Sequence, residues 1–253
     1  MSIGAVKLKE SSGNIKLRVK AAAQRAGRNA DDIKIVAVTK QVGLETIKIL
    51  SDLNWEDIGE NRVNDALEKS ASLPGNLFTW HMIGHLQTNK VKKAVSLFEY
   101  IHSLDNLYLA EIIQKEAEKA GKFIKVLIQV NVSGEATKQG IKPVELIDFY
   151  KEVRQITIRN SQFVQPNELD ECKKRGMKVV GLMTMAPLTD NPEETRPYFR
   201  RLKELLDELK SAFTNSDNAD DLKYLSMGMS RDFEIAVEEG ANLLRVGSAI
   251  FDS

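Results

Sequence analysis

Short apolar runs rich in β-branched residues recur along this chain at intervals of roughly 30 residues, and amphipathic stretches separate them. Eight runs predict strands, at residues 33–38, 55–59, 79–83, 100–103, 123–130, 179–183, 223–227 and 243–246. Eight strands, each followed by a helix, favour a (β/α)8 TIM barrel over an open sheet of five or six strands. The 253 residues suit a single domain of this kind, spanning 1–253.

Two segments depart from this alternation. Residues 5–26 predict an extra helix, since apolar side chains recur at helical spacing and Gly27 stands where a C-terminal cap would. We expect this N-terminal segment, residues 1–30, to pack on the barrel. Residues 156–176 show no clean period and contain Pro166, and therefore predict an irregular insertion before the sixth strand.

Composition excludes several classes of protein. The 36 basic and 36 acidic residues cancel, so the chain offers no positive field for nucleic acid or an anionic membrane. Cys172 is the single cysteine and cannot form an internal disulfide, and with three histidines we expect no structural zinc site. The first ten residues carry charges and no run approaches the roughly 18 apolar residues of a membrane span, so we expect a cytoplasmic protein.

Chemistry in such barrels sits at the carboxyl ends of the strands, and Lys40 ends the first one. A lysine that is partly desolvated has its pKa lowered, and its free amine can then attack a carbonyl and form a Schiff base. The alternative is that Lys40 merely extends its ammonium group into solvent.

The last two strands are followed by small residues, namely Ser226 and Gly228 after the seventh and Gly247 and Ser248 after the eighth. The loops at these two places form the recurring phosphate site of TIM barrels, where hydroxyl and amide donors hold the anion. The alternative is ordinary turn chemistry, with both glycines at positive φ and Ser230 capping its helix.

Three other strand ends carry weaker signals. Asn61 follows the second strand, together with Glu60, and could line a cavity or cap a helix. His81 and His85 flank the third strand, where extended backbone separates them by more than about 10 Å, so we expect packed or hydrogen-bonded histidines rather than metal ligands. Lys138, in the loop after the fifth strand, could approach the mouth of the barrel or be solvated.

Taken together, the strand ends resemble the YggS/PROSC family of pyridoxal phosphate homeostasis proteins, over nearly the whole chain. The matching motifs are Val38-Thr39-Lys40, Gly59-Glu60-Asn61, the WHMIGHLQTNK block at 80–90, GLMTM at 181–185, LSMGMS at 225–230 and RVGSAIF at 245–251. The resemblance implies a barrel like the N-terminal domain of alanine racemase, holding pyridoxal 5′-phosphate (PLP). The sequence departs from the family in two places: the insertion around residues 160–174 is longer than expected, and the sequence ends at Asp252-Ser253, where relatives usually continue through a glycine. Ser248 also stands where threonine is more usual.

The resemblance also assigns roles to residues. Lys40 falls on the Schiff-base lysine, and Ser226, Gly247 and Ser248 fall on phosphate-binding positions. Arg245 falls on the arginine that faces the pyridine nitrogen. Because a guanidinium only donates hydrogen bonds, that nitrogen should stay unprotonated, which makes the ring a poor electron sink. With Asn61, these residues form the predicted cofactor site.

The function implied is intracellular PLP homeostasis and delivery, with PLP-dependent apoenzymes as partners and a monomeric chain. Alanine racemase also needs a tyrosine base from a second domain, and none of the five tyrosines here ends a predicted strand. Loss of one positioned acid or base removes about two to four orders of magnitude in rate, so efficient catalysis is not expected. The alternatives are a weak PLP-dependent amino-acid racemase and, from another class, a Schiff-base aldolase acting on a phosphosugar.

Overall fold

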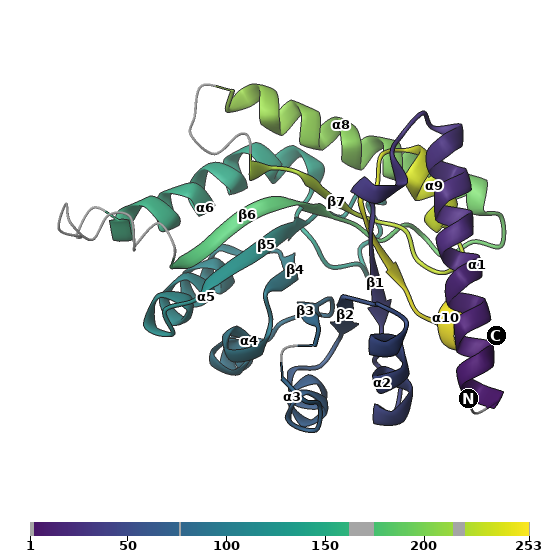
Figure 1. The fold of residues 1–253 in the computed structure, drawn as a ribbon. Coiled ribbons are helices and arrows are strands. Elements are labelled where there is room, and N and C mark those ends of the chain that lie inside the picture. Colours follow the sequence, from purple (N-terminus) through teal and green to yellow (C-terminus); the bar gives the residue numbers. More distant parts are fainter. Residues whose placement is uncertain (1–2, 76, 162–174, 215–220, 253) are drawn as a thin grey trace.

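Eight parallel strands close into one barrel, in the order β1 to β8 and back to β1 (Figure 1). The computed structural model describes residues 3–75, 77–161, 175–214 and 221–252. The strands are β1 (Lys34–Val38), β2 (Asp57–Glu60), β3 (Thr79–Met82), β4 (Tyr100–Leu104), β5 (Phe123–Gln129), β6 (Gly176–Met183), β7 (Tyr224–Ser226) and β8 (Leu243–Val246). The predicted (β/α)8 barrel is therefore confirmed, with each strand within a few residues of its predicted position.

Helices surround the strands (Figure 1). They are α1 (Ile3–Arg25), α2 (Leu44–Asp52), α3 (Val63–Ala71), α4 (Val91–Leu97), α5 (Leu107–Lys119), α6 (Leu146–Ser161), α8 (Arg196–Ala212), α9 (Phe233–Glu238) and α10 (Ser248–Phe251). The main apolar core lies between this ring and the barrel wall, because a buried parallel sheet needs apolar cover on its outer face. A smaller apolar cluster, which includes Val36, Leu127 and Leu243, is formed by residues of several strands.

The predicted N-terminal helix is present as α1. Leu8, Ile15 and Val19 are buried at helical spacing, and Gly27 adopts a φ of 64° just beyond the helix. The helix packs against α9 and α10 (Figure 1), and the Ser11 hydroxyl donates a 2.7 Å hydrogen bond to the carbonyl of Ile250. Helix α1 thus packs against α10, whose residues Ser248 and Phe251 line the mouth of the barrel.

The segment 156–176 differs from its prediction. Helix α6 continues to Ser161, so residues 156–161 are helical rather than irregular, and β6 begins at Gly176 rather than at residue 179. The apolar period fades here because the last turns of α6 leave the barrel, and Ile158 is 40% exposed. Residues 162–174, which include Cys172, lie outside the described residues.

Candidate functional site

A cavity of about 570 Å³ opens at the carboxyl ends of the strands. Five of the six residues predicted to hold a cofactor line it, namely Lys40, Asn61, Arg245, Gly247 and Ser248. The barrel therefore brings together residues that lie up to about 200 positions apart in the sequence, as expected of the catalytic face of this fold.

Ser226, the sixth predicted residue, is placed elsewhere. Its side chain is fully buried and does not line the cavity. The Ser226 hydroxyl oxygen accepts a 2.6 Å hydrogen bond from Nη1 of Arg245 and lies 2.9 Å from Nδ1 of His102. The structure thus places Ser226 against Arg245 and outside the cavity lining, and its role as a phosphate ligand stays a prediction.

Ser230 lines the cavity and links its last two loops. Its hydroxyl oxygen accepts hydrogen bonds of 3.2 Å from the backbone N–H groups of Gly247 and Ala249, at the start of α10. Ser230 therefore caps α10 and not α9, the helix that follows it in sequence. Gly228 has a φ of 90°, whereas Gly247 has a φ of −123°, so the alternative of two positive-φ turns is correct only for Gly228.

Lys40 is exposed at the cavity wall, so the desolvation expected for its amine is not found. The backbone before it is held firmly instead. Nζ of Lys69 donates 2.7 Å hydrogen bonds to the carbonyl of Thr39 and to Oε1 of Glu60, and the Thr39 hydroxyl donates to the same carboxylate oxygen at 2.7 Å. Glu60 is fully buried in its ion pair with Lys69 and does not line the cavity. These bonds fix the backbone at Thr39, directly before Lys40.

Asn61 lines the cavity at a point where the backbones that follow β2 and β3 come close together. A Cβ atom at Gly84 would lie 2.6 Å from the carbonyl oxygen of Asn61, closer than packed atoms come. Glycine at position 84 thus permits the backbones after β2 and β3 to touch.

Five side chains inside the barrel form one continuous run of hydrogen bonds, which we call the interior chain: Asp57, His81, His102, Ser226 and Arg245. Oδ1 of Asp57 lies 2.8 Å from Nε2 of His81, and Nδ1 of His81 lies 2.9 Å from Nε2 of His102. His102 then contacts Ser226, which contacts Arg245 as described above. Nη2 of Arg245 also donates to the carbonyl of Thr184 at 2.9 Å, so two bonds fix the guanidinium.

Electrostatics keep both histidines of the interior chain neutral. Burial lowers the pKa of His81, although Asp57 opposes the shift, and burial together with the charges of His81 and Arg245 lowers the pKa of His102 well below its ordinary value. Burial opposes the ionisation of Asp57, but hydrogen bonds from His81 and Lys34 keep its pKa below the ordinary value. Burial lowers the pKa of Arg245 to about 10, which leaves it cationic at neutral pH.

The other weak candidates fall in different places. His81 is packed and hydrogen-bonded as predicted, with its ring stacked 4.4 Å from that of Tyr100, whereas His85 is exposed and lines the cavity. Lys138 pairs with Glu135 in its own loop and is not among the cavity residues. Asp232, which the sequence did not single out, lines the cavity near Arg245, and burial raises its pKa.

Comparison with known proteins places the chain in a family. Residues 11–253 match the alanine racemase N-terminal domain family. A pyridoxal phosphate homeostasis protein from Aquifex aeolicus is 41% identical over 234 residues, which cover 92% of this chain and 92% of the relative. The chain belongs to the pyridoxal phosphate homeostasis protein family. The resemblance to the YggS/PROSC family is thereby confirmed.

Solved structures agree with this family membership. PipY of Synechococcus elongatus, solved with PLP bound, matches this chain with a TM-score of 0.69 and 30% sequence identity. The match covers 92% of this chain and 99% of the PipY chain. Alanine racemase of Clostridium difficile has a TM-score of 0.66 and 16% identity, over 94% of this chain and 55% of the racemase. At that identity the likeness concerns the fold alone, and it confirms the expected racemase-type barrel.

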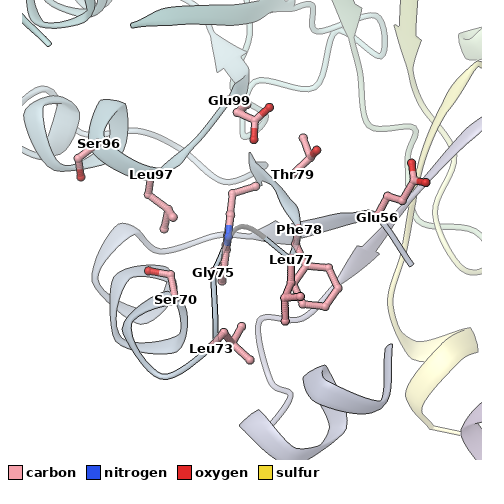
Figure 2. Close-up of a pocket in the computed structure, with 11 residues that line it drawn as sticks. Glu56, Ser70, Leu73, Gly75, Leu77, Phe78, Thr79, Ser96, Leu97 and Glu99 are labelled. Carbon is pink, nitrogen blue, oxygen red and sulfur yellow. The ribbon is translucent and has the colours of Figure 1, made fainter. Parts of the chain in front are cut away.

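A second cavity of about 470 Å³ lies at the opposite end of β3, between the end of α3 and α4 (Figure 2). Its described lining residues are mostly apolar or hydroxyl-bearing, and the charged ones, Glu56 and Glu99, are both acidic. An anionic cofactor would be repelled there, whereas the cavity at the mouth offers Lys40 and Arg245. In the described ranges no group of three His, Cys, Asp or Glu side chains could hold a metal ion. Nor is any helix in those ranges long and apolar enough to cross a membrane.

Proposed function

We propose that this chain binds PLP in the mouth cavity, joined to Nζ of Lys40 as a Schiff base, and acts in intracellular PLP homeostasis and delivery. The observation that carries the proposal is that Lys40, Arg245 and the turns that contain Ser230 and Ser248 line one cavity. The chain is also 30% identical to PipY, which was solved with PLP bound. PLP-dependent apoenzymes are the partners that this role requires, and we propose a monomer in the cytoplasm.

The residues of the cavity suit the chemical groups of PLP. The amine of Lys40 suits an aldehyde, and the guanidinium of Arg245, held by Ser226 and Thr184, suits a ring nitrogen that accepts a hydrogen bond. Gly247 and Ser248 offer a backbone turn and a hydroxyl for a phosphate, and Asn61 borders the same space. PLP supplies an electron-withdrawing ring when bound, but one that stays unprotonated opposite Arg245 withdraws electrons weakly.

The cavity also argues against efficient racemisation. All five tyrosines lie in the described ranges, and none of them lines the cavity. Besides Lys40, the side chains there with an imidazole or carboxyl group that could carry a proton are His85, Asp232 and Asp252. The cavity therefore lacks the tyrosine base that alanine racemase uses, and this supports binding and delivery of PLP without efficient catalysis.

The test is to load the purified protein with PLP, reduce it with borohydride and map the labelled peptide. We expect the label on Lys40 and none in Lys40→Ala, with a circular dichroism spectrum like that of the wild type. Lys138→Ala is the matched control, because it removes a lysine that lies outside the cavity, and it should label normally. A label that persists in Lys40→Ala would overturn the assignment of Lys40.

Two further measurements separate the alternatives. Incubation with L-alanine or L-serine and chiral analysis should show turnover far below the roughly 1 per second of ordinary enzymes, and a rate at that level would establish a racemase. A protein that stays colourless with added PLP would instead favour a Schiff-base aldolase.

A further inference from the structure

The interior chain places polar side chains where barrels of this type usually carry layers of branched apolar ones. Asp57, His81, His102, Ser226 and Arg245 come from β2, β3, β4, β7 and β8, and each is at most 5% exposed. Buried polar groups cost free energy unless every one is hydrogen-bonded, and here each is bonded to the next. The run begins near the surface at Lys34, 3.4 Å from Asp57, and ends in the cavity.

The two ends of the interior chain impose a direction on it. A carboxylate only accepts hydrogen bonds and a guanidinium only donates them. Asp57 must therefore receive the hydrogen on Nε2 of His81, and a neutral His81 then accepts at Nδ1 from Nε2 of His102. Neutral His102 in turn accepts at Nδ1 from the Ser226 hydroxyl. The Ser226 hydrogen points away from Arg245, so its oxygen is free to accept from Nη1.

We propose that Asp57, His81 and His102 are positioning residues for the mouth cavity: Asp57 sets the tautomers of both histidines, and His102 orients the Ser226 hydroxyl so that its oxygen holds Arg245. If the hydrogen bonds ran in the opposite direction, Nδ1–H of His102 would be a second donor to the Ser226 hydroxyl oxygen, which already accepts from Arg245. The part that concerns cofactor retention rests on the proposed function. The part that concerns the tautomers and Arg245 does not.

The decisive variant is Asp57→Asn, which keeps the shape and removes the charge. Lys34 only donates, so the new carbonyl turns to Lys34 and the new amide nitrogen turns to His81. His81 must then accept at Nε2, and the hydrogens of both histidines move to Nδ1. In the variant every hydrogen bond from position 57 to Ser226 therefore has its donor and acceptor exchanged.

Long-range ¹H–¹⁵N spectra of the apoprotein report this directly, since the protein has three histidines and His85 is exposed. We expect His81 and His102 as neutral Nε2–H tautomers in the wild type and as Nδ1–H tautomers in Asp57→Asn, with altered Nη resonances of Arg245. Release of bound PLP should be roughly tenfold faster in the variant, the effect of weakening one hydrogen bond from a charged group. Glu56→Gln is the matched control, because it removes an exposed carboxylate next to Asp57 in sequence.

A second pair of variants tests His102 itself. Glutamine can present its amide N–H to His81 and its carbonyl to Ser226, so His102→Gln should retain PLP like the wild type, whereas His102→Leu should release it roughly tenfold faster. Equal release from the two variants would overturn the proposal, as would Nδ1–H or cationic histidines in the wild type. A wild type that has the expected tautomers but binds no PLP would refute the proposed function and leave the positioning of Arg245 to be decided by its Nη resonances.

Discussion

Polar groups inside the barrel and polar groups on its outer surface are arranged on opposite principles. Outside, the single side chain of Arg196 makes three ion pairs, with Glu193, Glu238 and Glu239, at 2.7–3.0 Å, where α8 meets α9. Inside, the interior chain spans the barrel with one anion, one cation and three neutral groups between them. Charge is abundant where water can replace a lost partner, and scarce where nothing can replace it.

The sharpest test of this contrast is the buried pair of Lys69 and Glu60. Lys69→Met should destabilise the fold by about 3–5 kcal/mol, because it leaves the Glu60 carboxylate buried without a cation. Oε2 of Glu60 already has no hydrogen-bond partner in the described part of the chain, so the bonds from Lys69 and Thr39 to Oε1 are the ones that hold this carboxylate. Urea unfolding gives the free energy.

Lys48→Met is the control, since it removes a lysine from the exposed pair with Glu45 on α2. It should cost less than about 1 kcal/mol. Similar losses for the two variants would mean that burial does not distinguish the two classes of ion pair in this barrel.

The pH dependence of stability sharpens the comparison further. His81 and His102 have folded-state pKa values below the unfolded value, so the unfolded chain takes up their protons first as pH falls through about 6.5. Stability is therefore full above that pH and should fall steadily as the pH drops from about 7.5 to about 5.5. The surface glutamates Glu193 and Glu238 have pKa values lowered by their arginine partners and stay ionised throughout this window.

Unfolding curves of the wild type and His102→Gln across this range measure the effect. The variant has one buried histidine fewer and should lose less stability on acidification than the wild type. A wild type whose stability is flat over the same range would show that the two rings are protonated in the folded state as well.

The sequence predicted the strands and five residues that line the mouth cavity, but it did not reveal the interior chain. A strand in a closed barrel is a short apolar run, and Lys40 or Arg245 at its end is visible as a break in that run. The partner of a buried polar group is not visible, because His102 and Ser226 are 124 positions apart. A signal did exist in β4, where Tyr100 and His102 alternate with apolar and small residues and so share the inner face.

The orientation of side chains after β7 was the other obstacle. Ser226 and Ser230 are both hydroxyl residues near one strand end, and the resemblance assigned the phosphate position to Ser226. The structure points Ser226 inward to Arg245 and leaves Ser230 at the cavity, joined to Gly247 and Ala249. Four residues of backbone decide which of the two hydroxyls lines the cavity, and no periodic pattern extends through such a turn.

A small effect is also expected for the ion pairs of Arg196 on the outer surface. Arg196→Ala removes three ion pairs at once, yet it should cost only about 1 kcal/mol, because the arginine pairs with its carboxylates where water and salt screen them. The loss should shrink further in about 1 M salt, where the screening length is about 3 Å. Urea unfolding of both proteins at low and high salt measures this. A loss from Arg196→Ala as large as that from Lys69→Met, and equally insensitive to salt, would contradict the comparison, because the outer network would then stabilise the fold as strongly as a buried ion pair.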